Sequence, residues 1–559
     1  MTWCARSQRW GCSVQSKWLW VAIVVGLVLR LLTLNNALSF DEFVQTKAVL
    51  EANPAGLDKY TEMNPLTTWT RLAVTSILGV HVWSLRLTSL LFALLTLWVT
   101  FLLARELYGT KAARWATALL ALSAWHALVS TSISFDGAFL TFYTVLAMYC
   151  FVRYDRSDEH RWLVWCGLAS GLAMLTKYTG VLVVFALALY SLIRHKDWKR
   201  TAREGALVTA LCLAVFSVFP LVAFLTDPSY FWITLQHGQG YFGGRTISLS
   251  LLAIQYGLAL LWMGPLLLFG YFLSWKKRES RDWLSHSLII AILAFYTFVV
   301  QDPFRPVERY FTILLPALCM LAGKYYASLD FERKHWLWAG AAAVVGMTTS
   351  FIVNAMPGKI LPFYPKTQFI TAMFARDWNF FVPFTGDQGP VGLYVKFLIF
   401  ALAFGTSAAC VVLAVQRKKW AAPVLLGIGL ALSVFMMTEL ALHPTSPDVS
   451  RAFKETTSIA KQYPGPYFTF RDPALQYYLG QQATNIDFTS DPEKVGQQLI
   501  GTIAMVDFPA LDKQGKLWQV FNRCEPKSIV EDKGVRLGYV FVCGYVQNLK
   551  NQAATSEDG

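Results

Sequence analysis

The sequence has little charge. Only 15% of its 559 residues are Asp, Glu, Lys or Arg, whereas 55% are hydrophobic. This composition excludes a string of water-soluble domains and indicates a polytopic membrane protein with room for one soluble appendage. Acidic residues are the scarcer kind, with 35 against 49 basic ones and a net charge of +14. Because the basic residues come in short clusters between apolar runs, the excess reports membrane topology and does not indicate a nucleic-acid partner.

The sequence also lacks a cysteine pattern typical of a metal site, although it contains nine cysteines. Seven of them fall in apolar stretches or on the side expected to be cytoplasmic: Cys4, Cys12, Cys150, Cys166, Cys212, Cys319 and Cys410. Cys524 and Cys543 lie together in the C-terminal part, which predicts one disulfide in an oxidising compartment. Nothing in the sequence requires a cofactor, and a divalent metal ion is left as an option.

Thirteen stretches come near the length of about 20 mostly apolar residues that a membrane-spanning helix needs. They are 18–36, 84–106, 112–131, 138–153, 162–176, 179–194, 205–226, 249–273, 284–300, 309–328, 335–354, 391–415 and 421–441. Several are short, so the count is open by one or two. The first follows three basic residues and resembles a secretory signal, but we interpret it as an uncleaved transmembrane helix because further spans follow.

Clusters of Lys and Arg concentrate in cytoplasmic loops of membrane proteins. Here they fall in alternate loops, on the same side as the N-terminus: Arg105/Lys111/Arg114, Arg153/Arg156/Arg161, Arg194/Lys196/Lys199/Arg200/Arg203, Lys276/Lys277/Arg278/Arg281, Lys324/Arg333/Lys334 and Arg417/Lys418/Lys419. The pattern predicts a cytoplasmic N-terminus and, with thirteen spans, an extracytoplasmic C-terminus. The outer face would then consist of segments 37–83, 227–248, 355–390 and the tail.

We therefore expect two domains. Residues 1–441 form the transmembrane domain, whose first outer loop, 37–83, contains short interfacial helices around Pro65. Residues 442–559 form a small extracytoplasmic α/β domain, because helical stretches alternate there with short β-like runs. These segments are Val449–Tyr463, PYFTF at 466–470, ALQYYLG at 474–480, GTIAMVDF at 501–508 and GYVFVCGYV at 538–546.

Acidic residues of the outer segments are candidates for catalysis. Asp41 and Glu42 come directly after the first span, where a carboxylate next to hydrocarbon suggests a general base or a cation site. The alternative is a pair of solvated loop residues. Glu62 lies in the first outer loop, and Asp136 lies where two spans turn on the outside. Asp136 could also cap a helix that begins at Gly137.

Basic and aromatic residues are expected at the same face. Lys177 lies at the turn of a helical hairpin, and Arg305, Arg309 and Tyr310 come from another outer loop and the helix after it. Lys177 could instead snorkel to the interface, and Arg309 and Tyr310 could be membrane anchors. Acids and cations together suit a reaction in which a hydroxyl loses a proton while a phosphate leaves. His237 could hold a metal ion with Glu62, or be a solvated loop histidine.

Five motifs occur in an order that resembles the GT-C superfamily of membrane glycosyltransferases. They are the DE pair after a span with LRLL, the NPL turn, FDGAFLTFYTVLAMY, GLAMLTKYTG and RYFTILLPAL. The chain looks most like glycosyltransferase family 39, which includes protein O-mannosyltransferases and the bacterial 4-amino-4-deoxy-L-arabinose lipid A transferase. The resemblance covers about residues 15–330 well and the rest more loosely.

The resemblance implies inverting transfer of a sugar from a polyprenyl-phosphate carrier to an acceptor hydroxyl, at the outer face of a bacterial inner membrane. It assigns Asp41 as the base, Asp136 as a second carboxylate and Glu62 with His237 as a cation pair. Lys177, Arg309 and Tyr310 would flank the carrier phosphate. The family often has a basic residue and two prolines before the Leu of the outer-loop turn, where this chain has Met63, Asn64 and Pro65. Lys59 or Arg245 would then replace the missing cation.

The acceptor could be a lipid A-like glycolipid, a polysaccharide or, as in protein O-mannosyltransferases, Ser and Thr of exported proteins. Two other classes are open. A transporter or flippase for a lipid-linked sugar would show ionisable groups deep in several spans and an internal repeat, neither of which is evident here. A scaffold whose tail recruits partners would not need Asp41.

Overall fold

The computed structural model describes residues 20–21, 23–34, 36, 38, 42–43, 46, 49, 65–133, 135–226, 228–229, 232, 249–299, 308–361, 367–385, 390–470, 474–480, 483–486, 501–506 and 524–543. The chain divides into two compact units. Unit 1 contains residues 1–35, 45–350 and 400–437, and unit 2 contains residues 36–44, 351–399 and 438–559. Unit 2 thus includes more than the expected tail, because it also takes the residues around Glu42 and the segment that precedes α18 (Phe397–Val415).

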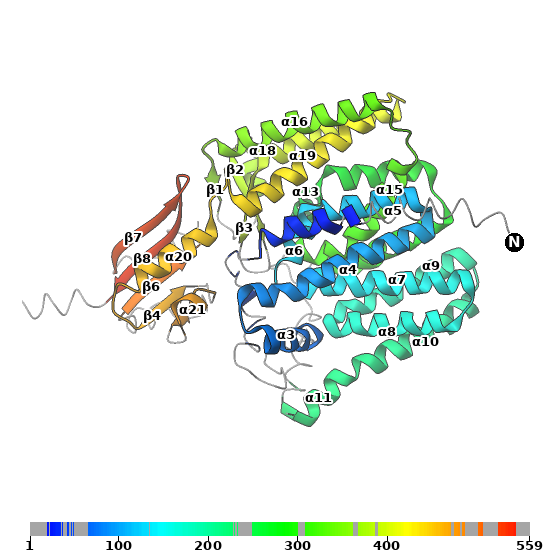
Figure 1. Cartoon of the computed structure of the whole chain (residues 1–559), viewed down its shortest axis with the longest axis horizontal. Helices are drawn as coiled ribbons and strands as arrows, with labels where there is room; N and C mark the ends of the chain where they lie inside the picture. The colour runs from blue at the N-terminus through cyan, green and yellow to red at the C-terminus, as the bar shows by residue number, and fades with distance from the viewer. Residues whose placement is uncertain are drawn as a thin grey trace, which may run out of the picture. The chain divides into compact units, whose positions relative to one another are not determined.

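Unit 1 is helical (Figure 1). After a first helix described over residues 23–31, its elements are α3 (Pro65–Leu78), α4 (Val82–Tyr108), α5 (Thr110–Ala121), α6 (Ala124–Ser130), the π-helix η2 (Phe135–Phe139), α7 (Leu140–Ser157), α8 (His160–Thr176), the 3-10 helix η3 (Tyr178–Val181), α9 (Leu182–His195), α10 (Trp198–Phe216), α11 (Val218–Thr226), α13 (Leu249–Ser274), η4 (Trp275–Lys277), η5 (Ser280–Asp282), α14 (Trp283–Phe298), η6 (Glu308–Leu314), α15 (Leu315–Ala327), and most of α16 (Arg333–Ala355), α18 and α19 (Ala421–Leu442).

Nine helices of the described residues are long and apolar enough to cross a membrane, and each matches one predicted span. A polytopic α-helical membrane fold is therefore confirmed. Of the other four predicted spans, those at 112–131, 162–176 and 284–300 are helical but short or broken, and the one at 18–36 is described only in part, with helix over residues 23–31. The span predicted at 112–131 divides into α5 and α6, because the Ser123 side chain accepts a hydrogen bond from His126 N and caps a new helix. Helices α8 and α14 have 17 and 16 residues.

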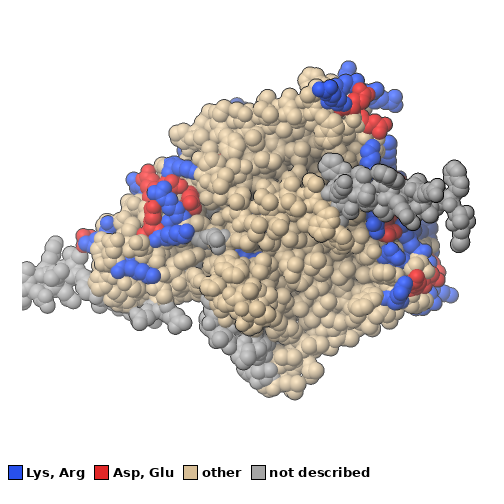
Figure 2. All heavy atoms as spheres, in the orientation of Figure 1, with Lys and Arg blue, Asp and Glu red and all other residues tan. Residues whose placement is uncertain are grey.

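The ends of these helices that carry the basic clusters lie along one edge of unit 1 in Figure 1, and Figure 2 shows charged side chains gathered at that edge. Buried carboxylates hold this end together. Asp155 of α7 accepts from the side chains of Arg194 and His195 of α9, at 3.1 and 2.7 Å. Glu204 of α10 accepts from Tyr154 and Ser191, both at 3.0 Å. These charged hydrogen bonds fix α7, α9 and α10 to one another.

Unit 2 contains two sheets. Strands β1 (Lys359–Ile360), β2 (Phe380–Thr385) and β3 (Pro390–Lys396) form a three-stranded sheet near α17 (Thr367–Phe374) in the chain. The sequence did not predict this sheet, and the span predicted from residue 391 is wrong at its start, because β3 occupies 390–396 and α18 begins at Phe397. Strand β3 pairs antiparallel with β2, the strand that precedes it in the chain, so its backbone groups bond to a neighbouring strand and not within a helix.

The tail forms a five-stranded sheet of order β5-β4-β6-β8-β7 with helices α20 (Val449–Ala460) and α21 (Ala474–Leu479). Its strands are β4 (Tyr467–Phe470), β5 (Thr484–Ile486), β6 (Gly501–Val506), β7 (Glu525–Asp532) and β8 (Val535–Cys543). Strands β5, β4 and β6 run parallel, and β8 is antiparallel to both of its neighbours. The predicted disulfide between Cys524 and Cys543 is present.

Candidate active site

Only some of the predicted site residues can be placed. Asp41, Lys59, Glu62, His237, Arg245 and Arg305 lie outside the described residues. Asp136 is described by its backbone, and Glu42, Lys177, Arg309 and Tyr310 are described with their side chains. Glu42 belongs to unit 2, where it is buried with 4% of its surface exposed. The other four belong to unit 1 and can be compared with one another.

Lys177 lies where α8 stops and η3 begins, as the predicted hairpin turn requires. Its backbone is extended, with φ −158° and ψ 141°, and its N–H donates to Ala173 O at 3.0 Å. Gly180 closes the turn by donating from its N–H to Lys177 O at 2.7 Å. A Cβ on Gly180 would stand 2.3 Å from the carbonyl carbon of Ala173, so only glycine fits. The GLAMLTKYTG motif therefore encodes a tight break that presents Lys177.

Asp136 belongs to the π-helix η2, a form that is rare and frequent at functional sites. The helix expected to begin at Gly137 is preceded by helical residues from Phe135, so the backbone of Asp136 lies inside the π-helix. Gly137 lets η2 press against α6, since a Cβ there would meet Val129 Cγ1 at 1.9 Å. The same π-helix contacts α8, which leads to Lys177, and η6, which carries Arg309.

Lys177, Arg309 and Tyr310 come together as predicted, and we call them the cation cluster. Lys177 Nζ lies 3.6 Å from the centroid of the Tyr310 ring, and Arg309 Cζ lies 5.9 Å from it. Tyr296 of α14 stacks on Tyr310 with ring centroids 5.2 Å apart. Lys177 and Arg309 are 9% and 6% exposed, so both cations are buried within unit 1.

Two cations around one ring raise the local positive potential. The distances to the shared ring place the two charges less than about 10 Å apart, which at an effective dielectric of 20 costs about 2 kcal/mol of repulsion. The π-face of Tyr310 offsets part of this through two cation–π contacts. An anion beside the cluster would interact favourably with both charges, so the arrangement is suited to binding a phosphate.

Arg71 was not among the predicted site residues. It lies on α3, in the first outer loop, where interfacial helices were expected; its surface is 1% exposed and its Cζ is 5.9 Å from the Phe139 ring of η2. Thr67, Thr68 and Thr75 share the buried face of this helix. The sequence signal for Arg71 is that it is the one charged residue in the apolar stretch of the expected interfacial helix, where a charge is costly.

Among the described residues, no group of three or more His, Cys, Asp and Glu side chains is arranged to hold a metal ion. Both members of the predicted pair, Glu62 and His237, lie outside that part of the chain.

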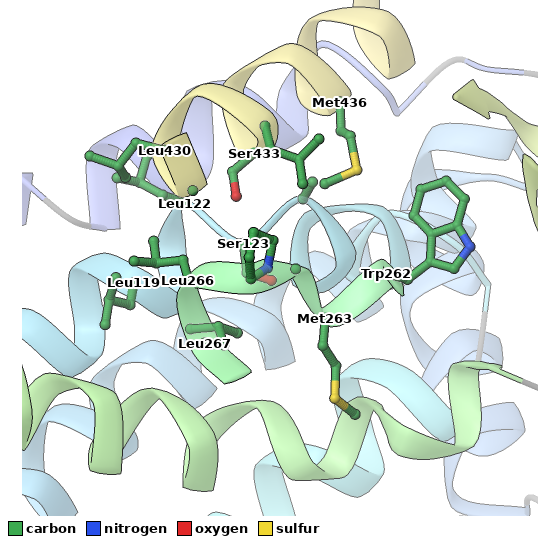
Figure 3. A pocket seen from close by; sticks show the side chains of 15 residues that line it. Leu119, Leu122, Ser123, Trp262, Met263, Leu266, Leu267, Leu430, Ser433 and Met436 are labelled. Carbon is green, nitrogen blue, oxygen red and sulfur yellow. The ribbon is translucent and has the colours of Figure 1, made fainter. Parts of the chain in front are cut away.

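A small pocket lined mostly by apolar residues lies elsewhere in unit 1 (Figure 3). It is bounded by the start of α6, by α19 and by the kink of α13, where Gly264 has φ 77° and precedes Pro265. Ser123 and Ser433 are the hydroxyl groups in its wall. None of the predicted site residues lines it.

Comparisons with known proteins agree on the fold. Residues 62–224 match the family model for dolichyl-phosphate-mannose-protein mannosyltransferases. The structure is similar to that of ArnT from Cupriavidus metallidurans bound to undecaprenyl phosphate, with 18% identity over 94% of this chain and 98% of that chain and a TM-score of 0.59. The structure of the apo form of that protein gives a TM-score of 0.58 with the same identity and coverage. No curated protein sequence matches significantly.

A more distant likeness, to the Archaeoglobus fulgidus oligosaccharyltransferase, has 12% identity over 95% of this chain and 74% of that chain and a TM-score of 0.43, too low to support an argument. The resemblance to GT-C membrane glycosyltransferases noted in the sequence is confirmed.

Proposed function

We propose that this chain, which has the GT-C fold, is an inverting glycosyltransferase that moves a sugar from a polyprenyl-phosphate carrier to an acceptor hydroxyl. The observation that carries the proposal is the cation cluster beside the π-helix of Asp136. When the sugar leaves, the carrier phosphate gains a negative charge. Fixed cations next to that phosphate stabilise the transition state more than the bound donor, and this difference accelerates the reaction.

The proposed step is a direct displacement. The acceptor oxygen attacks the anomeric carbon while Asp41 takes the hydroxyl proton, and the bond from the anomeric carbon to the phosphate oxygen breaks. Its electron pair goes to the phosphate, which Lys177 and Arg309 neutralise, with Arg305 and either Lys59 or Arg245 as further phosphate contacts. Asp136 is the second carboxylate. Glu42, Glu62 and His237 belong to the acceptor or cation site; a metal ion is not required.

The comparisons support a lipid-phosphate donor in two ways. The matching family model is described by a dolichyl-phosphate sugar, and the ArnT structure is named for bound undecaprenyl phosphate. We propose a glycolipid resembling lipid A, or a polysaccharide, as the acceptor, with exported proteins as the alternative. The reaction would take place at the outer face of a bacterial inner membrane, with transmembrane domain 1–441 and extracytoplasmic domain 442–559.

Purified protein in lipid nanodiscs, supplied with a polyprenyl-phosphate sugar and candidate acceptors, tests the proposal. We expect covalent transfer that Asp41→Asn abolishes and that Lys111→Met leaves unchanged, because the Lys111 side chain is 59% exposed at the start of α5, at the opposite end of α4 from the first outer loop. Movement of unmodified lipid without transfer would instead support a flippase. Assembly with partner proteins but no turnover would support a scaffold.

A further inference from the structure

The segment 36–44, which follows the first helix, belongs to unit 2, although the rest of that unit begins only at Phe351. Asn36, Leu38, Glu42 and Phe43 are its described residues. Leu38 and Glu42 are 1% and 4% exposed, so both are enclosed by protein. A buried carboxylate is costly, and the contacts that hold its segment therefore indicate how its position is fixed.

Two hydrogen bonds join this segment to later parts of unit 2. The Leu38 N–H donates to the Tyr478 hydroxyl at 3.1 Å. The Asn36 side chain donates from Nδ2 to Leu440 O, near the end of α19, at 3.1 Å. A buried backbone N–H needs an acceptor, and here a side chain of the C-terminal part supplies it. The contact at Leu38 therefore depends on one hydroxyl group.

Tyr478 is itself held within the C-terminal sheet domain, by which we mean the five-stranded sheet with α20 and α21. It lies on α21, which packs against α20, β4 and β6 and buries Leu475 completely. The Tyr478 ring lies 5.7 Å from the Phe453 ring of α20. Gln476 Nε2 donates to Ala483 O at 2.7 Å, just before β5. The tyrosine hydroxyl therefore has a defined place relative to the sheet.

The second anchor, at the end of α19, is fixed to the start of the tail. Glu439 is 0% exposed and accepts hydrogen bonds from Ser446 N and Oγ at 2.8 and 2.7 Å and from Thr445 N at 3.1 Å. Lys533, between β7 and β8, donates from Nζ to Ser446 O at 2.8 Å. Segment 36–44 is thus bonded at two points to parts of unit 2 that are also bonded to each other.

We propose that Tyr478 is a positioning residue for sugar transfer. Through its bond to Leu38, the C-terminal sheet domain holds the segment that carries Glu42. The inference rests on the proposed function, which assigns Glu42 to the acceptor or cation site. Loss of the hydroxyl should then act on the acceptor side of the reaction, because the donor phosphate is assigned to the cation cluster of unit 1.

The test removes single hydrogen bonds. Tyr478→Phe keeps the ring but removes the acceptor of the Leu38 N–H. Tyr477→Phe is the matched control, because it removes a hydroxyl from the preceding residue of the same helix, which is also half-buried. It keeps the ring contact between the two tyrosines, whose centroids are 5.2 Å apart. Asn36→Leu is a second variant, which removes the donor to Leu440 O.

Transfer is measured in nanodiscs with a polyprenyl-phosphate sugar and a lipid A-like glycolipid as acceptor. We expect Tyr478→Phe and Asn36→Leu to lower kcat/KM for the acceptor about fivefold to tenfold while KM for the donor changes less than twofold, because small displacements of positioned groups cost rate. Tyr477→Phe should keep the parent kinetics. Parent kinetics in Tyr478→Phe, or a rise in donor KM as large as the loss in kcat/KM for the acceptor, overturns the proposal.

A second measurement does not depend on turnover. Hydrogen exchange, followed by mass spectrometry on overlapping peptides across residues 36–44, reports the protection of the Leu38 amide. We expect exchange about fivefold faster in Tyr478→Phe, because one hydrogen bond is lost, and parent exchange in Tyr477→Phe. Unchanged exchange in Tyr478→Phe overturns the inference. Faster exchange in Tyr478→Phe, when the parent protein itself transfers no sugar, would leave the contact in place and instead refute the proposed function.

Discussion

Replacement of Lys177 by Met tests the cation cluster most directly. Met has a similar length but no charge, so Lys177→Met removes the ammonium that lies 3.6 Å from the Tyr310 ring centroid. A unit charge about 5 Å from a phosphate contributes roughly 3 kcal/mol at an effective dielectric of 20. Part of this attraction already acts on the bound donor, whose phosphate carries one negative charge, and the rest appears as the phosphate gains charge in the transition state. We therefore expect the transition state to lose about 2–3 kcal/mol relative to free enzyme and donor, or about 100-fold in kcat/KM.

The variant Lys177→Met changes two contributions to the free energy of unfolding, and they oppose each other. Loss of the cation–π contact costs about 1–2 kcal/mol at a desolvated site. Relief of the repulsion between Lys177 and Arg309 returns about 2 kcal/mol. These two contributions nearly cancel, so neither the cation–π contact nor the repulsion by itself predicts that sugar transfer falls through lost stability. If Lys177 had only a structural role, the variant would lose activity in proportion to its loss of stability.

The assay is transfer of radiolabelled sugar from a polyprenyl-phosphate donor in nanodiscs, with the melting temperature measured on the same samples. Lys177→Arg should recover most of the rate, because a cation remains, although the guanidinium places its charge differently. A fall in kcat/KM of less than threefold for Lys177→Met, in a preparation that Asp41→Asn inactivates, would refute the phosphate-binding role of the cluster.

Three further predictions concern stability. Gly180→Ala should prevent folding of the α8–η3 turn, because its Cβ would meet the Ala173 backbone at 2.3 Å, whereas Gly205→Ala in open space on α10 should raise stability by up to about 1 kcal/mol; thermal melts compare the two. Reduction of the bond between Cys524 and Cys543 should destabilise unit 2 by about 3 kcal/mol, seen as faster proteolysis of the tail with unit 1 intact. The pKa of His443 lies below its usual range, chiefly through burial; Lys533 lowers it further, while Asp448, Glu439 and Asp532 oppose the shift. The unfolded state therefore binds a proton first, so stability should fall as pH drops below about 6.5, and His443→Gln should flatten this dependence in melts from pH 7.5 to 5.

Local signals in the sequence predicted much of unit 1. Apolar length located the long spans, and the polar break in GLAMLTKYTG located the turn that presents Lys177. The sequence predicted only that Lys177 and Tyr310 lie at the same outer face. Their contact could not be predicted, because its geometry depends on how α8 and η6 pack. The break between α5 and α6 was missed although Ser123 is a typical helix cap, since hydropathy averaged over a window does not resolve one polar residue.

The sheet of β1, β2 and β3 was missed for a different reason. FFVPFT and PVGLYVK are short apolar runs, and a buried strand cannot be distinguished from the start of a buried helix by periodicity alone. Strands β2 and β3 are consecutive and pair with each other in antiparallel orientation, and β1 pairs with β2 in parallel, so the choice between strand and helix depends on contacts between separate runs. Arg30 shows the same limit: LRLL was noticed as part of a motif, but only the packing of the first helix against α6 reveals His126 and Ser130 as its partners.

The two ends of unit 1 use charge in different ways. At the basic-loop end, carboxylates that are almost fully buried bind cations of neighbouring helices, as Asp155 binds Arg194 and as Asp282 binds Lys324 at 2.8 Å. Such pairs resist separation, since breaking one leaves a buried charge uncompensated. This end therefore holds α7 to α9 and η5 to α15. Lys177 and Arg309 lie in the chain just before α9 and α15, so these ion pairs bind the far ends of the helices that follow the two cations.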